Sequence, residues 1–233
     1  MQTEEQAIPT HLGIIMDGNR RWARDQGLPT LEGHRKGVDN IKTIARHAFD
    51  CGVKVMTIYA WSTENWKRTK DEVDYLMDLA VKLATKEMKE LGKENVRVVV
   101  LGVDDHVPPK VMRAWRDAEE ETQDNTGGTI AVCFNYGGTR ELVDATKSIV
   151  ASGAKADDIT EGVISEHLYH PEIPEIDLMI RTSGEQRISN FMLWRMRYAE
   201  MYFVDKHWPV FSTDDLDEAL ESFAQRNRRM GGN

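Results

Sequence analysis

The sequence has few of the features that stabilise secreted or membrane proteins. It contains only two cysteines, Cys51 and Cys133, each among apolar or small residues and neither in a C-x-x-C pair. We therefore predict reduced, buried thiols and neither a disulfide nor a metal site. No apolar run approaches the roughly 20 residues that a membrane-spanning helix needs. Met1–Thr10 lacks a basic flank and an apolar stretch, so we expect no signal peptide and a cytoplasmic location.

Several motifs of common enzyme classes are also missing. No G-x-x-x-x-G-K-[ST], no G-x-G-x-x-G after a strand and no G-x-S-x-G occurs, which argues against P-loop, dinucleotide-binding and α/β-hydrolase sites. The seven histidines show no H-E-x-x-H or other zinc spacing. Net charge is −9, from 30 basic and 39 acidic residues, so we expect no nucleic-acid partner. Phosphate binding would then need local clusters of arginine.

The pattern of apolar residues predicts an α/β fold. A chain of 233 residues fits a single domain spanning 1–233, with residues 1–10 expected to be flexible. Short β-rich runs alternate with segments of helical period, which predicts a mostly parallel six-stranded sheet with helices on both faces. The predicted strands are His11–Met16, Val53–Ala60, Val96–Leu101, Thr129–Asn135, Ile176–Ile180 and a weaker one at Met201–Val204. The predicted helices are Val38–Phe49, Asp71–Leu91, Pro109–Thr122, Thr139–Ala151 and Asp214–Arg226.

Ligands of such sheets bind beyond the carboxyl ends of the strands, and the first strand is followed by an acid and two arginines. Asp17 and Gly18 precede Asn19, Arg20 and Arg21. Gly18 allows a tight turn, and Asn19 is predicted to cap the next helix, whose amide groups then face an anion. Arginines suit phosphate oxygens, and Mg²⁺ would bridge them to the carboxylate. An ordinary strand–helix turn with surface arginines explains these residues equally well.

Two later segments carry weaker signals. Ser62–Arg68 has short polar side chains that cap the helix that follows or contact a ligand, and capping is the favoured interpretation. Arg181–Asn190 combines two arginines with hydroxyl groups and a glycine, which suits a second phosphate cradle. Glu200 is either a second metal carboxylate or a surface charge.

Together these segments resemble the cis-prenyltransferase (undecaprenyl diphosphate synthase) family in order and spacing over almost the whole chain. The strings DGN-x-RW and RTSGE-x-R-x-SNF are the most specific. The matching pieces are HLGIIMDGNRRWA (His11–Ala23), Gly33 with His34, YAWSTENWKR (Tyr59–Arg68), NYGGTR (Asn135–Arg140), DLMIRTSGEQRISN (Asp177–Asn190), Trp194 with Tyr198–Glu200, and Trp208 with Pro209. The chain lacks the paired Asp-rich helical motifs of the all-helical, trans-type prenyl synthases.

The resemblance implies roles for individual residues. Asp17 would bind Mg²⁺ and help the allylic diphosphate to leave, and Glu200 would be a second metal-associated carboxylate. Asn65 would orient a group during proton removal, since an amide is a poor base. The allylic diphosphate would contact Gly18, Asn19, Arg20, Arg21, Trp22 and His34. A closing loop would supply Ser62, Thr63, Glu64, Trp66 and Arg68; isopentenyl diphosphate would contact Arg181, Arg187, Ile188 and Ser189; and Arg229 and Gly231 would reach the site across a homodimer interface.

The resemblance also implies an activity. Isopentenyl diphosphate would be joined to farnesyl or geranylgeranyl diphosphate, giving a Z-polyprenyl diphosphate such as undecaprenyl diphosphate. The growing chain would occupy a hydrophobic tunnel lined by the apolar face of Asp71–Leu91, and peripheral membrane contact would assist product release. The alternatives are a short- or medium-chain synthase, a non-catalytic partner subunit, and a different phosphate-handling α/β enzyme.

Four positions depart from the family pattern. Thr30 stands where relatives commonly have an arginine near the allylic diphosphate, and Arg20, at a position that is often glycine, is expected to compensate. Arg195 and Arg197 are more basic than is usual there. They are expected to be surface charges or to alter the dimer contact near Glu200.

Overall fold

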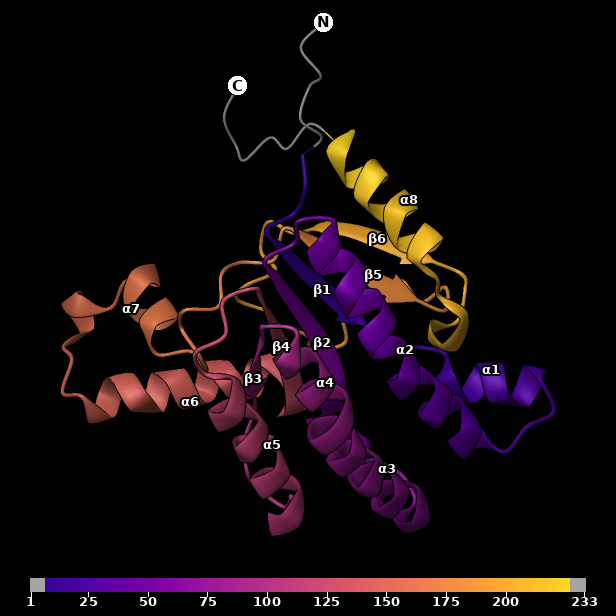
Figure 1. The fold of residues 1–233 in the computed structure, drawn as a ribbon. Coiled ribbons are helices and arrows are strands. Elements are labelled where there is room, and N and C mark those ends of the chain that lie inside the picture. Colours follow the sequence, from indigo (N-terminus) through magenta and orange to yellow (C-terminus); the bar gives the residue numbers. More distant parts are fainter. Residues whose placement is uncertain (1–6, 227–233) are drawn as a thin grey trace, which may run out of the picture.

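A six-stranded, all-parallel sheet forms the centre of the structure (Figure 1). The computed structural model describes residues 7–226. The strand order is β3-β4-β2-β1-β5-β6, and every neighbouring pair is parallel. This confirms the predicted sheet. Its strands are β1 (His11–Ile15), β2 (Val55–Ser62), β3 (Val96–Leu101), β4 (Gly128–Tyr136), β5 (Leu178–Thr182) and β6 (Glu200–Val204).

Helices flank the sheet, as predicted. None of the helices in residues 7–226 has the length and apolar character required to cross a membrane. Short helices at Asn19–Asp25 and Glu161–Glu166 lie outside the predicted helical segments, because each has too few turns to show a clear period. The helices are α1 (Asn19–Asp25), α2 (Thr30–Asp50), α3 (Lys70–Lys82), α4 (Lys89–Lys93), α5 (Pro109–Thr122), α6 (Gly138–Ala151), α7 (Glu161–Glu166) and α8 (Thr213–Ala224).

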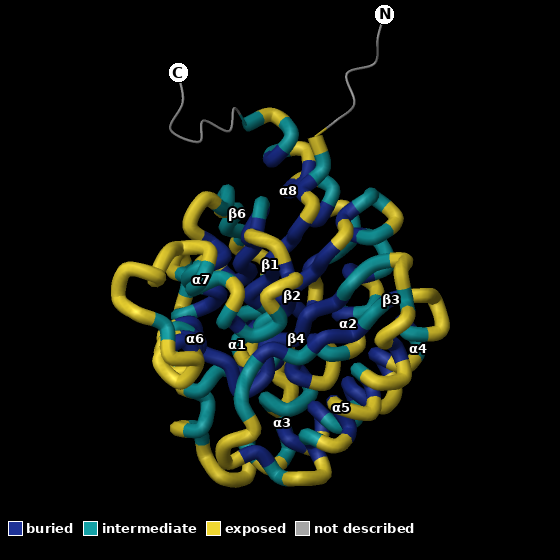
Figure 2. Tube along the Cα trace, turned by 90° about the vertical axis from the view of Figure 1, so that its left-hand side faces the viewer, coloured by how far each residue is buried: buried dark blue, intermediate teal, exposed yellow. Residues whose placement is uncertain are grey.

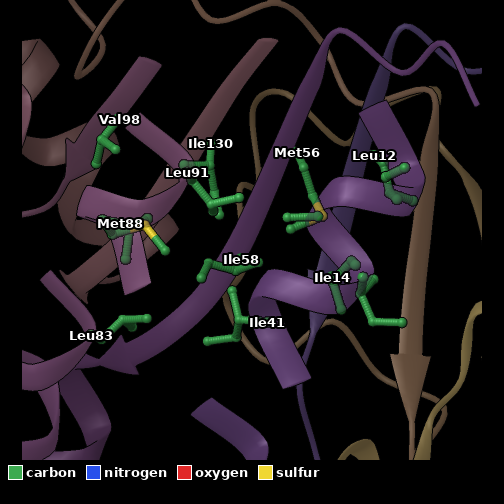
Figure 3. Close-up of a cluster of buried hydrophobic side chains, with 14 of the residues drawn as sticks. Leu12, Ile14, Ile41, Met56, Ile58, Leu83, Met88, Leu91, Val98 and Ile130 are labelled. Carbon is green, nitrogen blue, oxygen red and sulfur yellow. The ribbon is translucent and has the colours of Figure 1, made fainter. Parts of the chain in front are cut away.

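Alternating strand residues build two separate cores. Leu12 and Ile14 of β1, with Met56 and Ile58 of β2, join a core under α2, α3, α5 and α8 (Figure 3). The other face carries a smaller core that is covered in part by residues 169–199. Side chains of a strand point alternately to the two faces, and burial of both faces explains the nearly continuous apolar runs of these strands. The buried centre and exposed periphery are visible in Figure 2.

The segment predicted as one helix, Asp71–Leu91, is divided into three parts. A π-helical segment, Leu83–Met88, separates α3 from α4. Its residue Glu87 is almost fully buried and lies 3.0 Å from Lys42 Nζ of α2. A π-helical turn widens the helix locally and is frequent at functional sites. Hydrophobic period alone does not reveal such a turn, because the apolar positions before and after it remain regularly spaced.

The three central strands end side by side, and their connections meet at one edge. β1 pairs with β2 on one side and with β5 on the other. Asp17 follows β1, Ser62 ends β2, and the loop 183–190 follows β5. The connections from β1 lead to β2 on one side and later to β5 on the other. A parallel sheet opens a crevice for ligands at the carboxyl ends of strands where the order changes side in this way.

Candidate active site

The Asp17 carboxylate is surrounded by hydrogen-bond donors. Its Oδ2 accepts a hydrogen bond from Arg181 Nη2 at 2.9 Å, and its Oδ1 accepts one from the Gly18 N–H at 2.7 Å. Arg21 Nη2 lies 3.1 Å from Oδ1. Burial alone would raise the pKa of Asp17, but the bonds from Arg181 and Gly18 and the charge of Arg21 outweigh it and lower the pKa. The group is therefore an anion at neutral pH.

Two glycines allow the backbone to approach closely around Asp17. Gly18 has φ of 98°, and a Cβ there would lie 2.6 Å from Ser183 Oγ. A Cβ on Gly33 of α2 would lie 2.0 Å from the Asn19 carbonyl oxygen, so α1 and α2 meet without side chains between them. The prediction that Asn19 caps α1 is wrong by one residue. Gly18 is the N-cap in a left-handed conformation, and Asn19 is the first helical residue.

The loop after β5 forms the second arginine cradle. Arg181 is almost fully buried, and its Nη1 donates to Ser189 Oγ at 2.8 Å and to the Arg187 carbonyl oxygen. Ser189 and Asn190 have φ of 48° and 64°, a left-handed conformation that non-glycine residues adopt rarely. Strain of this kind is retained where the surroundings fix it, and often at functional sites.

A polar network from α1, α2 and α3 stands opposite that cradle. Glu72 of α3 accepts a hydrogen bond from Arg68 Nη1 at 2.8 Å and lies 3.4 Å from His34 Nε2 and 3.8 Å from Arg20 Nη1. Burial lowers the pKa of His34 to about 4, with help from the positive charge of Arg68. His34 is therefore neutral at pH 7 and can donate or accept one hydrogen bond at each ring nitrogen according to its tautomer.

The segment after β2 is a short 3₁₀ helix, Thr63–Lys67. Asn65 Oδ1 accepts a hydrogen bond from the Ser62 N–H at 3.1 Å, so this segment caps its own short helix. The prediction that it caps the helix that follows is wrong, because the N-cap of α3 is Thr69, which makes no side-chain capping bond. Glu64 accepts a hydrogen bond from Asn190 Nδ2 at 3.0 Å, which ties this segment to the loop after β5. The amide oxygen of Asn65 is therefore engaged, and its NH₂ group remains to donate.

Three cavities meet at Met16 and Arg68, which line all of them. The first basic cavity, of about 800 Å³, contains Asp17, Gly18, Arg20, Arg21, Thr30 and His34. The second basic cavity, of about 600 Å³, contains Asp17, Ser62, Asn65, Arg181, Arg187 and Ser189. The apolar cavity, of about 140 Å³, contains Val38, Ile41, Leu76, Leu79, Ala80, Leu83, Trp115 and Phe134. Asp17 lines both basic cavities.

Buried polar atoms without hydrogen-bond partners concentrate around these cavities. Among the described residues they are Asn19 Oδ1, His34 Nε2, Trp61 Nε1, Trp115 Nε1 and Arg181 Nε. Each of these residues lines one of the three cavities. A buried donor or acceptor left unpaired costs about 1–3 kcal/mol, so this distribution favours a bound polar ligand.

The structure brings together most, but not all, of the residues predicted from the sequence. Trp22, Thr63, Trp66 and Ile188 line none of these three cavities. Trp66 Nε1 instead donates to Asn135 Oδ1 at 2.7 Å. Arg229 and Gly231 lie outside the described residues. The substrate contacts predicted for all of these residues remain predictions.

Glu200 and Asp17 are not brought together within one chain. Glu200 is in register with Leu178 of β5 and so with Leu12 of β1, five residues before Asp17. At about 3.3 Å per residue, it lies roughly 16 Å away along the strand direction. Its Oε2 accepts a hydrogen bond from Arg226 Nη1 at 2.8 Å. The metal role of Glu200 stays a prediction, and a single chain offers no geometry for it.

Comparison with known proteins decides the family. The family model described as "Putative undecaprenyl diphosphate synthase" matches residues 15–231. An isoprenyl transferase of Thermotoga maritima is 45% identical over 227 residues, which is 97% of each chain. The chain belongs to this prenyltransferase family. An isoprenyl transferase of Enterococcus faecalis is 47% identical over 237 residues, covering 98% of this chain and 88% of the relative.

Solved structures of prenyltransferases have the same fold. Lavandulyl diphosphate synthase from Lavandula x intermedia, in complex with dimethylallyl diphosphate, superposes with a TM-score of 0.93 at 37% identity over 96% of this chain and 98% of its own. A probable undecaprenyl diphosphate synthase from Campylobacter jejuni gives 0.82 at 27% identity over 97% and 99%. These likenesses confirm the predicted fold and family, and with the isoprenyl transferases they identify the chain as a prenyltransferase.

Glu72 was not among the predicted site residues of this prenyltransferase, and Asn190 was included only as the last residue of the predicted second phosphate cradle. Glu72 connects Arg20, His34 and Arg68. Its spacing of four residues from Arg68 gave no helical signal, because Arg68 precedes the start of α3. Asn190 Oδ1 accepts a hydrogen bond from the Thr139 N–H at 2.8 Å while its Nδ2 holds Glu64. Nothing in the sequence around Asn190 indicates its contact with Glu64.

The interpretation of Arg195 as a surface charge is wrong, whereas that of Arg197 is confirmed. The Arg195 side chain is 3% exposed, and its Nη1 lies 2.8 Å from Glu141 Oε1, whose side chain is 1% exposed. Further bonds from Arg195 reach the carbonyl oxygens of Tyr169, His170 and Ile173. Arg197 is partly exposed and pairs with surface acids. Arg195 therefore joins Glu141 to the backbone of residues 169–173 inside the protein.

Proposed function

We propose that this chain is a Mg²⁺-dependent cis-prenyltransferase that condenses isopentenyl diphosphate with an allylic diphosphate. The observation that carries the proposal is the position of Asp17, on the shared wall of two arginine-lined cavities beside an apolar one. Two diphosphates and one hydrocarbon chain are the groups that such a reaction must hold at once. A homodimer and a cytoplasmic location belong to the same proposal.

The oxygen ligands that Asp17 and a bound diphosphate would offer fit a hard divalent cation. Mg²⁺ is commonly held by one or two carboxylates together with phosphate oxygens of the substrate, and Asp17 supplies one carboxylate facing both basic cavities. Its present partners, Arg21 and Arg181, can also donate hydrogen bonds to phosphate oxygens. A diphosphate that took over these arginines would release the carboxylate. When bound, Mg²⁺ would neutralise charge on the departing diphosphate.

The protein residues then have separate tasks in the reaction. The allylic carbon–oxygen bond breaks, and the electron pair leaves with the diphosphate, towards Arg20 and Arg21. The double bond of isopentenyl diphosphate attacks the remaining allylic cation, and a carbon–carbon bond forms. Arg181, Arg187 and Ser189 hold the second diphosphate during this step. A proton is finally lost to a diphosphate oxygen or to water, and the Asn65 NH₂ group orients the acceptor.

The test of the proposal is product formation. The purified chain is incubated with farnesyl diphosphate, labelled isopentenyl diphosphate and Mg²⁺, and products are separated by chain length. We expect labelled, extended prenyl diphosphates in the presence of Mg²⁺ and none after chelation. Absence of product with dimethylallyl, geranyl, farnesyl and geranylgeranyl starters would refute the proposal.

Arg20 is predicted to assist the allylic diphosphate. Its side chain is 61% exposed, lines the first basic cavity and is only weakly held, 3.8 Å from Glu72. It is therefore free to turn to an incoming anion near Thr30. We expect Arg20→Ala to raise the KM for the allylic substrate about tenfold, the loss of one charge-assisted hydrogen bond, with KM for isopentenyl diphosphate unchanged. Steady-state kinetics with each substrate varied would measure this.

Arg35→Ala provides the matched control. Arg35 is an exposed helical arginine that likewise pairs with acids, Glu32 and Asp39, and it lines neither basic cavity. Its replacement should leave both KM values unchanged. If the Arg20→Ala enzyme kept the wild-type KM for the allylic substrate, Arg20 would not compensate for the arginine that Thr30 replaces.

A short product is a second candidate, favoured by the size of the apolar cavity. Its volume is about 140 Å³, and a dry cavity of about 150 Å³ holds one benzene molecule. The cavity as it stands therefore accommodates about one five-carbon unit. A longer chain requires its wall of α3 and Leu83 to move outward, away from Trp115 of α5.

Enlarging this cavity should lengthen the product. Leu83 is buried, lines the cavity and begins the π-helical segment. We expect Leu83→Ala to shift the product distribution by at least one isoprene unit, because each buried CH₂ of the chain gains about 0.8 kcal/mol. Product chromatography measures the shift. Leu91→Ala is the control, since Leu91 is equally buried in α4 but does not line the cavity; the same shift in both variants would contradict a local effect.

A further inference from the structure

A cluster of His47, Cys51 and Asp217 lies apart from the cavities described above. His47 and Cys51 are one turn apart at the end of α2, and Asp217 comes from α8. His34, at the substrate end of α2, precedes His47 by 13 residues, which is about 20 Å of helix. None of the three residues lines any of the three cavities. The cluster therefore has no place in prenyl transfer.

The distances among its donor atoms suit a metal ion. Cys51 Sγ lies 3.7 Å from His47 Nε2 and 3.9 Å from Asp217 Oδ1. Tetrahedral Zn²⁺ with bonds of 2.0–2.3 Å separates its ligand atoms by about 3.3–3.7 Å. His47 Nε2 and Asp217 Oδ1 are now 2.6 Å apart, as hydrogen-bonded atoms are. Their separation must increase by roughly 0.7 Å for both atoms to bind one tetrahedral ion.

The cluster is accessible to an ion and acidic in character. The Asp217 side chain is 47% exposed and that of His47 is 29% exposed, so an ion can enter and water can complete its coordination. The negative charges of Asp217 and Asp50 lie close to the Cys51 thiol, and a nearby cation would offset them. The Cys51 thiol, one helical turn after His47, adds a third possible ligand atom to this His–Asp pair.

We propose that His47, Cys51 and Asp217 bind one Zn²⁺ ion, or a cation of similar softness, which links the end of α2 to α8. Imidazole, thiolate and carboxylate are all ligands of Zn²⁺, and thiolate selects softer ions than Mg²⁺. Binding releases the thiol proton to solvent, and the proton that His47 Nε2 now donates to Asp217 moves to Nδ1 so that Nε2 can bind the ion. Because it joins two helices away from the diphosphate cavities, the ion acts on stability and not on the chemical step.

Spectroscopy with Co²⁺ as a probe of the site tests this proposal. The full chain, freed of metal with a chelator and kept in excess Mg²⁺, is titrated with Co²⁺. We expect one equivalent to produce a thiolate-to-cobalt absorption band that Zn²⁺ abolishes. Cys51→Ser should remove the band, and Asp217→Asn, a change at an exposed position, should weaken Co²⁺ binding at least tenfold. Cys133→Ala should retain the band, since Cys133 is buried against Met192.

Thermal unfolding gives a second measurement that is independent of the spectrum. Zn²⁺ at about 100 times its dissociation constant should raise the Tm of the wild-type chain by roughly 5 °C or more. The Cys51→Ser chain should show no such shift. Absence of the band in the wild type, its persistence in Cys51→Ser, or an equal Zn²⁺ effect on both melting curves would overturn the proposal.

Discussion

Replacing Asp17 with asparagine is expected to lower the turnover number about a thousandfold, at the upper end of what one preorganised electrostatic contact contributes. Asparagine keeps the shape of the side chain but removes the charge that Arg21 and Arg181 now hold and replaces one acceptor oxygen by an NH₂ group. The backbone does not depend on that charge, because the Asp17 carbonyl oxygen accepts hydrogen bonds from Thr182 Oγ1 and from the Trp208 N–H. Single-turnover rates at saturating substrate would measure the effect on chemistry.

Binding of isopentenyl diphosphate should change much less in this variant. Arg181 loses an anionic partner, but it keeps its bond to Ser189 and becomes more available to a diphosphate. Asp39→Asn, at an exposed position in α2, is the control and should leave turnover unchanged. If Asp17→Asn retained more than a tenth of the wild-type turnover, the proposed metal and leaving-group role of Asp17 would be refuted.

The largest effect on stability is expected from Arg195→Met. This change leaves Glu141 as a buried carboxylate held only by neutral donors, Tyr136 Oη and the Tyr169 N–H. Breaking a buried ion pair by removing one partner costs about 3–5 kcal/mol, or roughly 6–20 °C in Tm for a chain of this size. Urea unfolding and calorimetry would measure the loss.

Two further variants separate charge from packing. Arg197→Met removes a neighbouring arginine whose ion pairs are exposed, and it should cost about 1 kcal/mol or less. Adding Glu141→Gln to Arg195→Met removes the uncompensated charge and should recover part of the loss, which reveals coupling between the two sites. Equal destabilisation by Arg195→Met and Arg197→Met would show that the buried pair has no special contribution.

Periodicity and strand-end residues were sufficient to predict the sheet and the place of the site. The apolar strands are short and bounded by turns, so all six could be located from the sequence, with shifts of at most two residues at either end. One such shift is at β2, which begins at Val55 because the Val53 N–H is bound to Ala48 at the end of α2. Asp17, Arg21 and Arg181 were predictable because parallel strands place their carboxyl ends at one edge.

What could not be predicted depends on contacts between distant residues. Arg195 carries the same signal in the sequence as a surface arginine, and only the fold places Glu141 beside it, 54 positions earlier. The π-helical turn leaves the apolar pattern intact. The prediction of two buried thiols holds for Cys133 but not for Cys51, which is partly exposed. Its spacing of four residues from His47 was visible, but Asp217 lies 166 positions away from Cys51.

The π-helical segment between α3 and α4 also bears on how related proteins can differ in the number of residues in this helix. Compared with a regular helix, a π-type turn accommodates one additional residue. Removing one residue from an ordinary helix turns everything that follows by about 100°, which would expose the buried faces of Met88 and Leu91. A deletion within Leu83–Met88 can instead be absorbed by restoring a regular turn. The cavity-lining half of the helix can thus lose a residue while the half anchored in the core keeps its orientation.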